Sequence, residues 1–291
     1  MARILVTGAG GMLGSAVAAT AMAAGHDVGA RERSQLDITD AGAVDAALAS
    51  EPWGAVINCA AWTDVDGAEE HEEQATRVNG EGPANLASAC ATHGARLLHV
   101  STDYVFAGDK EGPYLESDRP GPRSAYGRSK LAGEEAVAVS GADHAIVRAG
   151  WLYGAGGGNF VDTMLRLGGE RESVSVVDDQ LGRPTWTGDL APALVALATA
   201  PATGLFHAAG QGSCTWFGLA RAVLELAGSP CVVQAATTDE FQRPAPRPAN
   251  SVLDTERGGD AVRLGPWQDG LVAYLNEIGA ALPAEAGGGS R

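Results

Sequence analysis

The sequence predicts an α/β protein, with a Rossmann-like, doubly wound parallel sheet and a smaller mixed α/β C-terminal lobe. Short apolar runs alternate with helical segments over the first half of the chain, which is typical of a parallel sheet with right-handed crossovers. A glycine-rich turn directly follows the first apolar run. Beyond residue 150 the alternation becomes irregular, and this change indicates a second unit.

The domain boundaries follow from that change of pattern. With 291 residues the chain exceeds the size at which a single hydrophobic core usually stops growing. We expect a dinucleotide-binding domain over residues 1–150 and about 171–199, and a substrate-binding lobe over 151–170 and about 200–282. The tail at 283–291 is rich in Ala and Gly, and we expect it to be flexible.

Composition restricts the partners. The chain has 20 Lys and Arg against 36 Asp and Glu, and we expect no nucleic-acid partner because phosphate backbones need a basic face. We find no secretory signal and no apolar run near the roughly 18 residues of a membrane span, so we expect a cytoplasmic protein without membrane contact. The four cysteines are widely spaced and form no Cys-x-x-Cys pair, so no metal site is expected.

The first element is a buried strand that leads into a phosphate-binding turn. The apolar run Arg3–Thr7 is followed by glycines in GxxGxxG spacing and then by a helical segment, Ser15–Ala24. Such glycines permit a tight turn, close approach of a diphosphate and close helix–strand packing, while helix amides face the phosphates. The alternative is a tight turn without a ligand. The expected cofactor contacts here are Gly8, Gly11, Met12, Leu13 and Gly14.

The second strand, Asp27–Ala30, bears on the choice of cofactor. An acidic residue at this position would bind the ribose hydroxyl of NAD, whereas a basic one accommodates the 2′-phosphate of NADP. The strand ends in Arg31-Glu32-Arg33, and we assign Arg31 to the phosphate. The sequence therefore favours NADPH, and Glu32 leaves NADH possible.

The turn after this strand contains Asp37 and Ile38, both of which we assign to the cofactor. A carboxylate at this place can accept a hydrogen bond from an adenine amino group. The alternative is that Asp37 belongs to the cap of the next helix, which begins near Thr39 or Asp40.

The third strand, Ala55–Asn58, ends in small residues that allow backbone to lie along a cofactor. We expect Ala60, Ala61 and Trp62 to contact it. The acidic run over 64–73 is interpreted as a solvated helix start, because acids suit the positive end of a helix. Asn79 is then expected to precede a helix that has Pro83 in its first turn.

The fourth strand, Arg96–Ser101, delivers Thr102 to the carboxyl edge of the sheet, where ligands of open parallel sheets bind. A loop over 108–123, rich in Gly, Pro and charged residues, leads to a helix that carries Tyr126 and Lys130. Residues four apart lie on one helix face.

A phenol is a weak acid at neutral pH, and a nearby ammonium would lower its pKa. We therefore interpret Tyr126 as the proton donor, Lys130 as the group that tunes it, and Thr102 as the hydroxyl that holds a carbonyl oxygen. The alternative is a half-buried structural tyrosine and a lysine in solvent. Ala145–Arg148 is the next predicted strand.

The remainder is predicted as the lobe. We expect a helix over Phe160–Leu167 that begins at Asn159, a strand Val174–Val177 added to the main sheet, and a helix Asp189–Ala198 that Asp189 caps and that returns to the first domain. Further predicted elements are Leu205–His207, Trp216–Ala227, Val232–Val233 and Gln268–Ile278.

Three prolines exclude a helix over residues 242–248. We hypothesise that Arg243 or Arg247 faces a substrate diphosphate, because guanidinium groups suit phosphate, and we assign Arg247 to the substrate. The alternative is an exposed loop arginine. All six histidines are interpreted as structural or exposed.

Together these motifs resemble the extended short-chain dehydrogenase/reductase family, and most closely the dTDP-4-dehydrorhamnose reductases. The resemblance implies hydride transfer from NADPH to the C4 ketone of a dTDP-linked 4-keto-6-deoxy-L-hexose. It also implies that Tyr126 protonates the alkoxide, Lys130 binds the nicotinamide ribose, Thr102 binds the carbonyl, Asp103 positions the sugar and Trp151 covers it. The motifs are Gly8/Gly11/Gly14, Asn58–Ala61, Ala61–Asp66, Ser101–Phe106, Tyr126–Lys130, Leu131–Glu134, Arg148–Tyr153, Asp179–Thr185 and Arg247–Ser251.

Two departures refine that expectation. Related sugar-nucleotide dehydratases carry an Asp-Glu pair after the threonine, whereas here Asp103 is followed by Tyr104, which favours a simple reductase. Some members form dimers bridged by magnesium through three glutamates. At the matching places this chain has Ala16, Gly188 and Glu277, so we expect no metal and either a monomer or a weak homodimer.

Two other functions remain open at this stage. One is a non-catalytic nucleotide-binding regulatory subunit of the same fold. The other is a sugar-nucleotide epimerase, which would consume no net NADPH.

Overall fold

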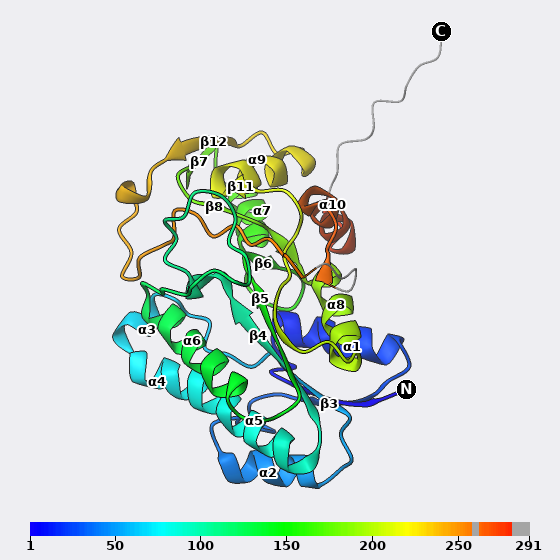
Figure 1. Ribbon diagram of the computed structural model, residues 1–291. Coiled ribbons are helices and arrows are strands. Elements are labelled where there is room, and N and C mark those ends of the chain that lie inside the picture. Colours follow the sequence, from blue (N-terminus) through cyan, green and yellow to red (C-terminus); the bar gives the residue numbers. More distant parts are fainter. Residues whose placement is uncertain (258–261, 281–291) are drawn as a thin grey trace.

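The structure is a computed structural model that describes residues 1–257 and 262–280. The predicted flexible tail, 283–291, lies outside the described residues. A central sheet with helices on both faces forms the larger part of the molecule, and the lobe lies at one end of it (Figure 1).

The main sheet has six strands in the order β10-β5-β4-β3-β1-β2, and every pairing is parallel. The chain starts at β1, adds β2 on one side, and then adds β3, β4, β5 and β10 in turn on the other side. The direction of winding therefore reverses beside β1, and a crevice opens there at the carboxyl ends of the strands. The strands are β1 Arg3–Thr7, β2 Asp27–Arg31, β3 Ala55–Asn58, β4 Arg96–Thr102, β5 His144–Ala149 and β10 Gly204–His207.

Alternate residues of the strands enter two separate cores. Ile4 and Val6 of β1 pack against helices α1 and α8, while Leu5 packs on the opposite face against α2 and α5. This alternation follows from the two-residue period of a strand. The helices are α1 Met12–Ala23, α2 Ala41–Ala49, α5 Gly82–His93, α6 Ala125–Ala138 and α8 Thr187–Thr199.

The helix predicted over Asp189–Ala198 corresponds to α8, which packs against α1 of the first domain as expected (Figure 1). The prediction that Asp189 caps this helix is wrong. The N-cap residue is Trp186, and Asp189 lies in the first turn.

A buried asparagine interrupts the regular helix that precedes β4. Helices α3 (Gly67–Glu70) and α4 (Glu72–Thr76) lead into a π-helical turn, η1 (Arg77–Glu81), that continues into α5. Asn79 lies inside η1 and so precedes α5, which has Pro83 in its first turn as predicted; the N-cap of α5 is Glu81. Its side chain bonds both backbone groups of Trp62 and the hydroxyl of Ser129.

The lobe has its own core, between α7, α9, α10 and a two-stranded parallel sheet formed by β7 and β12. The prediction that β7 joins the main sheet is therefore wrong, because it pairs with β12 instead. Conversely, β10 was assigned to the lobe but pairs with β5 in the main sheet. The elements are α7 Phe160–Glu170, β7 Ser173–Val177, α9 Trp216–Leu226, β12 Val232–Ala236 and α10 Trp267–Glu277.

Short elements connect the two parts. Strand β6 (Leu152–Tyr153) pairs with β9 (Thr185–Trp186), and β8 (Leu181–Gly182) pairs with β11 (Cys214–Thr215). A 3₁₀ turn, η2 (Asp103–Val105), follows β4 directly. Among the described residues, no helix is both long and apolar enough to cross a bilayer.

A buried ion pair fixes α6 to the sheet. Two guanidinium nitrogens of Arg148 on β5 donate to the two carboxylate oxygens of Glu134 on α6, at 2.9 and 2.6 Å. Both side chains are almost completely buried. The guanidinium also lies over the ring of Phe106, 4.8 Å from its centroid. The pair therefore sets the position of the helix that carries Tyr126 and Lys130.

We predict that Glu134→Ala lowers the free energy of unfolding by about 3–5 kcal/mol, because it leaves a buried guanidinium without its partner. Urea denaturation measures this change. Glu135→Ala is the matched control, since the neighbouring side chain is exposed and its loss should change stability little. Equal effects of the two substitutions would contradict the prediction.

Candidate active site

A crevice of about 930 Å³ lies at the carboxyl edge of the sheet, between the first domain and the lobe. It brings together the glycine turn, the end of β2, the turn after β3, the end of β4, the start of α6 and the loop after β5. Of the residues predicted as functional, the crevice is lined by Gly8, Gly11, Met12, Leu13, Gly14, Asp37, Ile38, Ala60, Ala61, Trp62, Thr102, Asp103, Tyr126, Lys130 and Trp151.

At two positions of the glycine turn, neighbouring backbone leaves no room for a side chain. Gly8 has φ +68°, and a Cβ there would lie 2.6 Å from the backbone nitrogen of Ala60. A Cβ on Gly14 would lie 2.1 Å from the carbonyl oxygen of Gly8. Gly11, the N-cap of α1, supplies no side-chain cap, so the first amides of the helix are free to face an anion.

The end of β2 presents Arg33 to the crevice and not Arg31, which was the predicted residue. The Arg31 guanidinium bonds the backbone carbonyl of Ala30 and does not line the cavity. Arg33 and Glu32 do line it, and Arg33 is largely exposed, with its Nε 3.6 Å from Asp37. Strand β2 ends at Arg31, so Arg33 lies in the turn beyond the strand and faces the crevice from there.

Asp37 is not the helix cap. Its carboxylate accepts hydrogen bonds from the backbone nitrogen and hydroxyl of Thr39, and these bonds lower its pKa. Asp40 caps α2 by accepting from the backbone nitrogen of Ala43. Asp37 is therefore held at the rim of the crevice with its charge retained at neutral pH.

A buried polar chain holds the turn after β3. The amide oxygen of Asn58 accepts from the Thr7 hydroxyl at 2.7 Å and from the backbone nitrogen of Ala60 at 3.1 Å, while its nitrogen lies 3.0 Å from Nδ1 of His99. Asn58 and Asn79 thus fix the wall made by Ala60, Ala61 and Trp62. Sequence reasoning gave neither asparagine this role, because the bonds connect segments far apart in the chain.

Thr102, Tyr126 and Lys130 meet at the centre of the crevice. Tyr126 is in the first turn of α6, whose start is fixed by the side chain of Ser124 accepting from the backbone nitrogen of Gly127. Lys130 follows one turn later, and its Nζ donates to the carbonyl oxygen of Val100 at 2.7 Å. The sequence prediction that these groups come together is in accord with this geometry.

The electrostatics differ from the expectation that Lys130 acidifies Tyr126. Burial raises the pKa of Tyr126 to about 12, although the Thr102 hydroxyl acts in the opposite direction. Burial also lowers the pKa of Lys130 to about 8. The ammonium is directed to the Val100 carbonyl, so desolvation dominates the phenol. Tyr126 is consequently a protonated phenol at neutral pH, which is the state of a proton donor.

Asp103 and Trp151 form the side of the crevice nearest the lobe. The Asp103 side chain is buried, and burial raises its pKa to about 6. Its Oδ1 accepts from the Thr102 hydroxyl at 3.0 Å, whereas Oδ2 has no partner of regular geometry among the described residues. The Trp151 ring stacks on Trp216 of α9 with centroids 3.6 Å apart.

Arg247 lies outside the lining of the crevice. Its guanidinium donates to the carboxylate of Asp66 at 2.9 Å, and Arg243 lies 3.5 Å from the same carboxylate. The prediction that the acidic run over 64–73 is simply solvated is therefore wrong for Asp66, which is paired with two arginines. Glu72 also pairs with Arg128 on α6. In the described ranges we find no cluster of acids, histidines and cysteines that could hold a metal ion.

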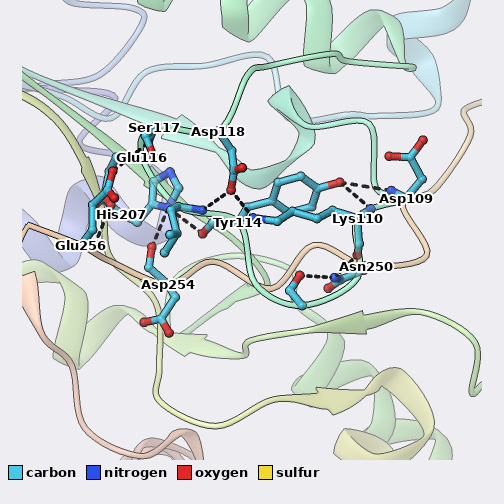
Figure 2. A network of polar contacts seen from close by, with 12 residues as sticks. Asp109, Lys110, Tyr114, Glu116, Ser117, Asp118, His207, Asn250, Asp254 and Glu256 are labelled. Carbon is cyan, nitrogen blue, oxygen red and sulfur yellow. Dashed lines mark hydrogen bonds and ion pairs between the residues drawn. The ribbon is translucent and has the colours of Figure 1, made fainter.

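A second polar network fixes the loop between β4 and α6 (Figure 2). The Tyr114 hydroxyl accepts hydrogen bonds from three successive backbone nitrogens, those of residues 108–110. Nδ1 of His207 lies 2.9 Å from the carbonyl oxygen of Asp254, and its backbone nitrogen donates to Glu116. His207 thus has a structural role, in line with the interpretation of the histidines.

A family model, curated relatives and solved structures all relate this chain to the same family. The family model described as "RmlD substrate binding domain" matches residues 2–280. The dTDP-4-dehydrorhamnose reductase of Streptomyces griseus is 50% identical over 98% of this chain and 95% of its own length. That of Mycobacterium tuberculosis is 47% identical over 94% of this chain and 92% of its own. The crystal structure of dTDP-4-dehydrorhamnose reductase from Bacillus anthracis in complex with NADP superposes with a TM-score of 0.92 and 37% identity, covering 95% of this chain and 99% of that one.

We predict that Arg33→Ala raises the KM for NADPH about tenfold and changes the KM for NADH little, because a basic residue facing the crevice pairs with a 2′-phosphate. Steady-state kinetics with both cofactors measures the effect. Arg31→Ala is the matched control and should leave the preference unchanged. A larger effect at Arg31 would restore the assignment made from sequence.

Proposed function

The chain belongs to the dTDP-4-dehydrorhamnose reductase family, and on that premise we propose that it reduces the C4 ketone of a dTDP-4-dehydro-6-deoxy-L-hexose to give dTDP-L-rhamnose or a close relative. Family membership makes it an NADPH-dependent oxidoreductase. The observation that carries the proposal is the shared crevice, in which a glycine turn and the group Thr102, Tyr126 and Lys130 face one another.

The residues present fit NADPH. The closely packed turn at Gly8 and Gly14 leaves room only for backbone, so a diphosphate can approach the first amides of α1. Met12 and Leu13 would contribute those amides, while Ala60 and the turn after it would lie along the cofactor. When bound, NADPH supplies the hydride that reduces the ketone.

Tyr126 would provide the proton. As C4 receives the hydride, its oxygen becomes an alkoxide, a much stronger base than a phenolate, so a phenol with pKa about 12 can still donate to it. The Thr102 hydroxyl, which donates to Asp103 in this structure, would turn to donate to the same oxygen and hold that oxygen within reach of Tyr126. The Lys130 ammonium would bind the nicotinamide ribose and stabilise the phenolate left after transfer.

The sugar would be held from the lobe side. Asp103 lines the crevice, and its Oδ2 is a buried acceptor without a partner among the described residues, so a sugar hydroxyl is the donor that would suit this side chain. Trp151 presents an apolar ring to the same space and would cover the hexose. Arg247 could reach the substrate diphosphate only by exchanging its partner Asp66 for phosphate.

The proposal is tested by supplying dTDP-4-keto-6-deoxy-L-hexoses with NADPH and following nicotinamide absorbance and the sugar product together. We expect stoichiometric consumption of both. An epimerase would convert the sugar without net NADPH oxidation, and a regulatory subunit would bind the cofactor without turnover. Either outcome would contradict the proposal.

We predict that Tyr126→Phe lowers kcat at least a hundredfold while the Kd of NADPH stays within about twofold, because the variant lacks only the proton donor. Tyr104→Phe is the control, since its ring packs edge-to-face on Tyr126 at 5.6 Å and has no assigned role in proton transfer. It should keep turnover within about tenfold. Retained turnover in Tyr126→Phe would assign the proton to another group.

We predict a bell-shaped dependence of kcat/KM on pH, with limbs near the pKa values of about 6 for Asp103 and about 8 for Lys130. Below the first limb Asp103 becomes protonated and stops accepting from the sugar, and above the second Lys130 loses its charge. In Lys130→Arg the guanidinium does not titrate, so the basic limb should disappear from this range. A basic limb that persists in this variant would belong to another group.

A further inference from the structure

A segment of the lobe, residues 245–253, here called the strap, is bound to three other parts of the chain. At one end the carboxylate of Asp66 accepts from the backbone nitrogen of Ala245 and from Arg247. In the middle, the Asn250 side chain donates to two carbonyl oxygens of the loop between β4 and α6, as Figure 2 shows in part. The strap is therefore held in place independently of the crevice.

Ser251 is the point at which the strap reaches the active site. Its backbone nitrogen donates to the carbonyl oxygen of Leu181 at 2.8 Å, and its side chain is almost fully buried. The Ser251 hydroxyl accepts a hydrogen bond from Nε1 of Trp151 at 3.2 Å. The same hydroxyl lies beside the Asp103 carboxyl, where it helps to lower a pKa that burial raises. The hydroxyl thus contacts two crevice residues, since it accepts from the indole and lies beside the carboxyl.

Trp151 needs such support because its backbone is strained. Within the described ranges it is the one non-glycine residue with positive φ, at +52°. A bulky residue in this region is held there by its surroundings. The indole stacks on Trp216 with rings 4° from parallel, and a Cβ on Gly182 would lie 2.1 Å from it. Ser251 supplies the polar contact that fixes the ring within this stack.

We propose that Ser251 is a positioning residue that fixes the indole of Trp151 and the carboxylate of Asp103 relative to each other, and so sets the orientation of the keto sugar. The inference rests on the proposed function. It concerns the hydroxyl alone, because the backbone bonds of the strap persist in an alanine variant. Loss of the hydroxyl frees the indole and removes a neighbouring group that helps to lower the pKa of Asp103.

The test compares Ser251→Ala with the wild type in the intact enzyme. We expect the KM for the dTDP-4-keto sugar to rise about tenfold, since the hydrogen bond that orients the indole is lost and one hydrogen bond contributes up to roughly that factor. The Kd of NADPH should stay within about twofold. The acidic limb of kcat/KM should move to higher pH, because the hydroxyl that helps to lower the pKa of Asp103 is lost. The titratable groups that face this carboxylate, Tyr104 and Tyr126, stay neutral across this limb.

Three further variants separate positioning from simple folding. Ser251→Thr keeps the hydroxyl and should restore both the KM and the acidic limb. Trp216→Ala removes the stack without touching Asp103, so it should raise the KM and leave the limb in place. Asn250→Ala weakens the strap one residue away, and its kinetic constants should remain close to those of the wild type.

The proposal is overturned if Ser251→Ala has wild-type KM and an unmoved acidic limb. It is also overturned if Asn250→Ala reproduces the whole defect, since the strap and not the hydroxyl would then be responsible. Failure of the proposed function is a different result, because the wild type itself would not oxidise NADPH with any dTDP-4-keto sugar.

Discussion

The position of α6 is the constraint on which the active site depends. Gly127 and Gly133 allow this helix to lie against neighbouring backbone so closely that a Cβ would come within 2.2 Å of the Tyr104 carbonyl and 2.1 Å of the Asn79 carbonyl. The ion pair between Glu134 and the sheet then holds the helix at that distance. A phenol and an ammonium one turn apart reach the crevice only because the helix cannot move outward.

Burial has the same effect on every ionisable group at the centre of the crevice. It raises the pKa of Tyr126 and of Asp103 and lowers that of Lys130, so in each case the neutral form is favoured. Hydroxyl groups from Thr102 and Ser251 partly compensate at Asp103. The protonation states of Tyr126, Asp103 and Lys130 are therefore set mainly by their removal from water. Attraction between the phenol and the ammonium contributes less.

The sequence predicted the parts of the structure that local patterns encode. The first five strands, the turn at Gly8 and the meeting of Tyr126 with Lys130 follow from apolar runs, glycine spacing and helical periodicity. The sheet to which Val174–Val177 belongs could not be predicted, because pairing depends on segments distant in the chain. The sequence does not show the role of Asn79, which is set by contacts across the fold. It does not show that of Arg33 either, because the exact end of β2 and the path of the turn after it decide which arginine faces the crevice.

The chain passes between the two parts of the molecule several times. It leaves the sheet after β5, returns at α8 and β10, and enters the lobe again before the strap binds back to Asp66. The lobe is therefore not joined to the sheet by a single linker about which it could swing freely. We therefore expect entry of a sugar nucleotide to involve a shear motion, the small sliding of packed segments past one another.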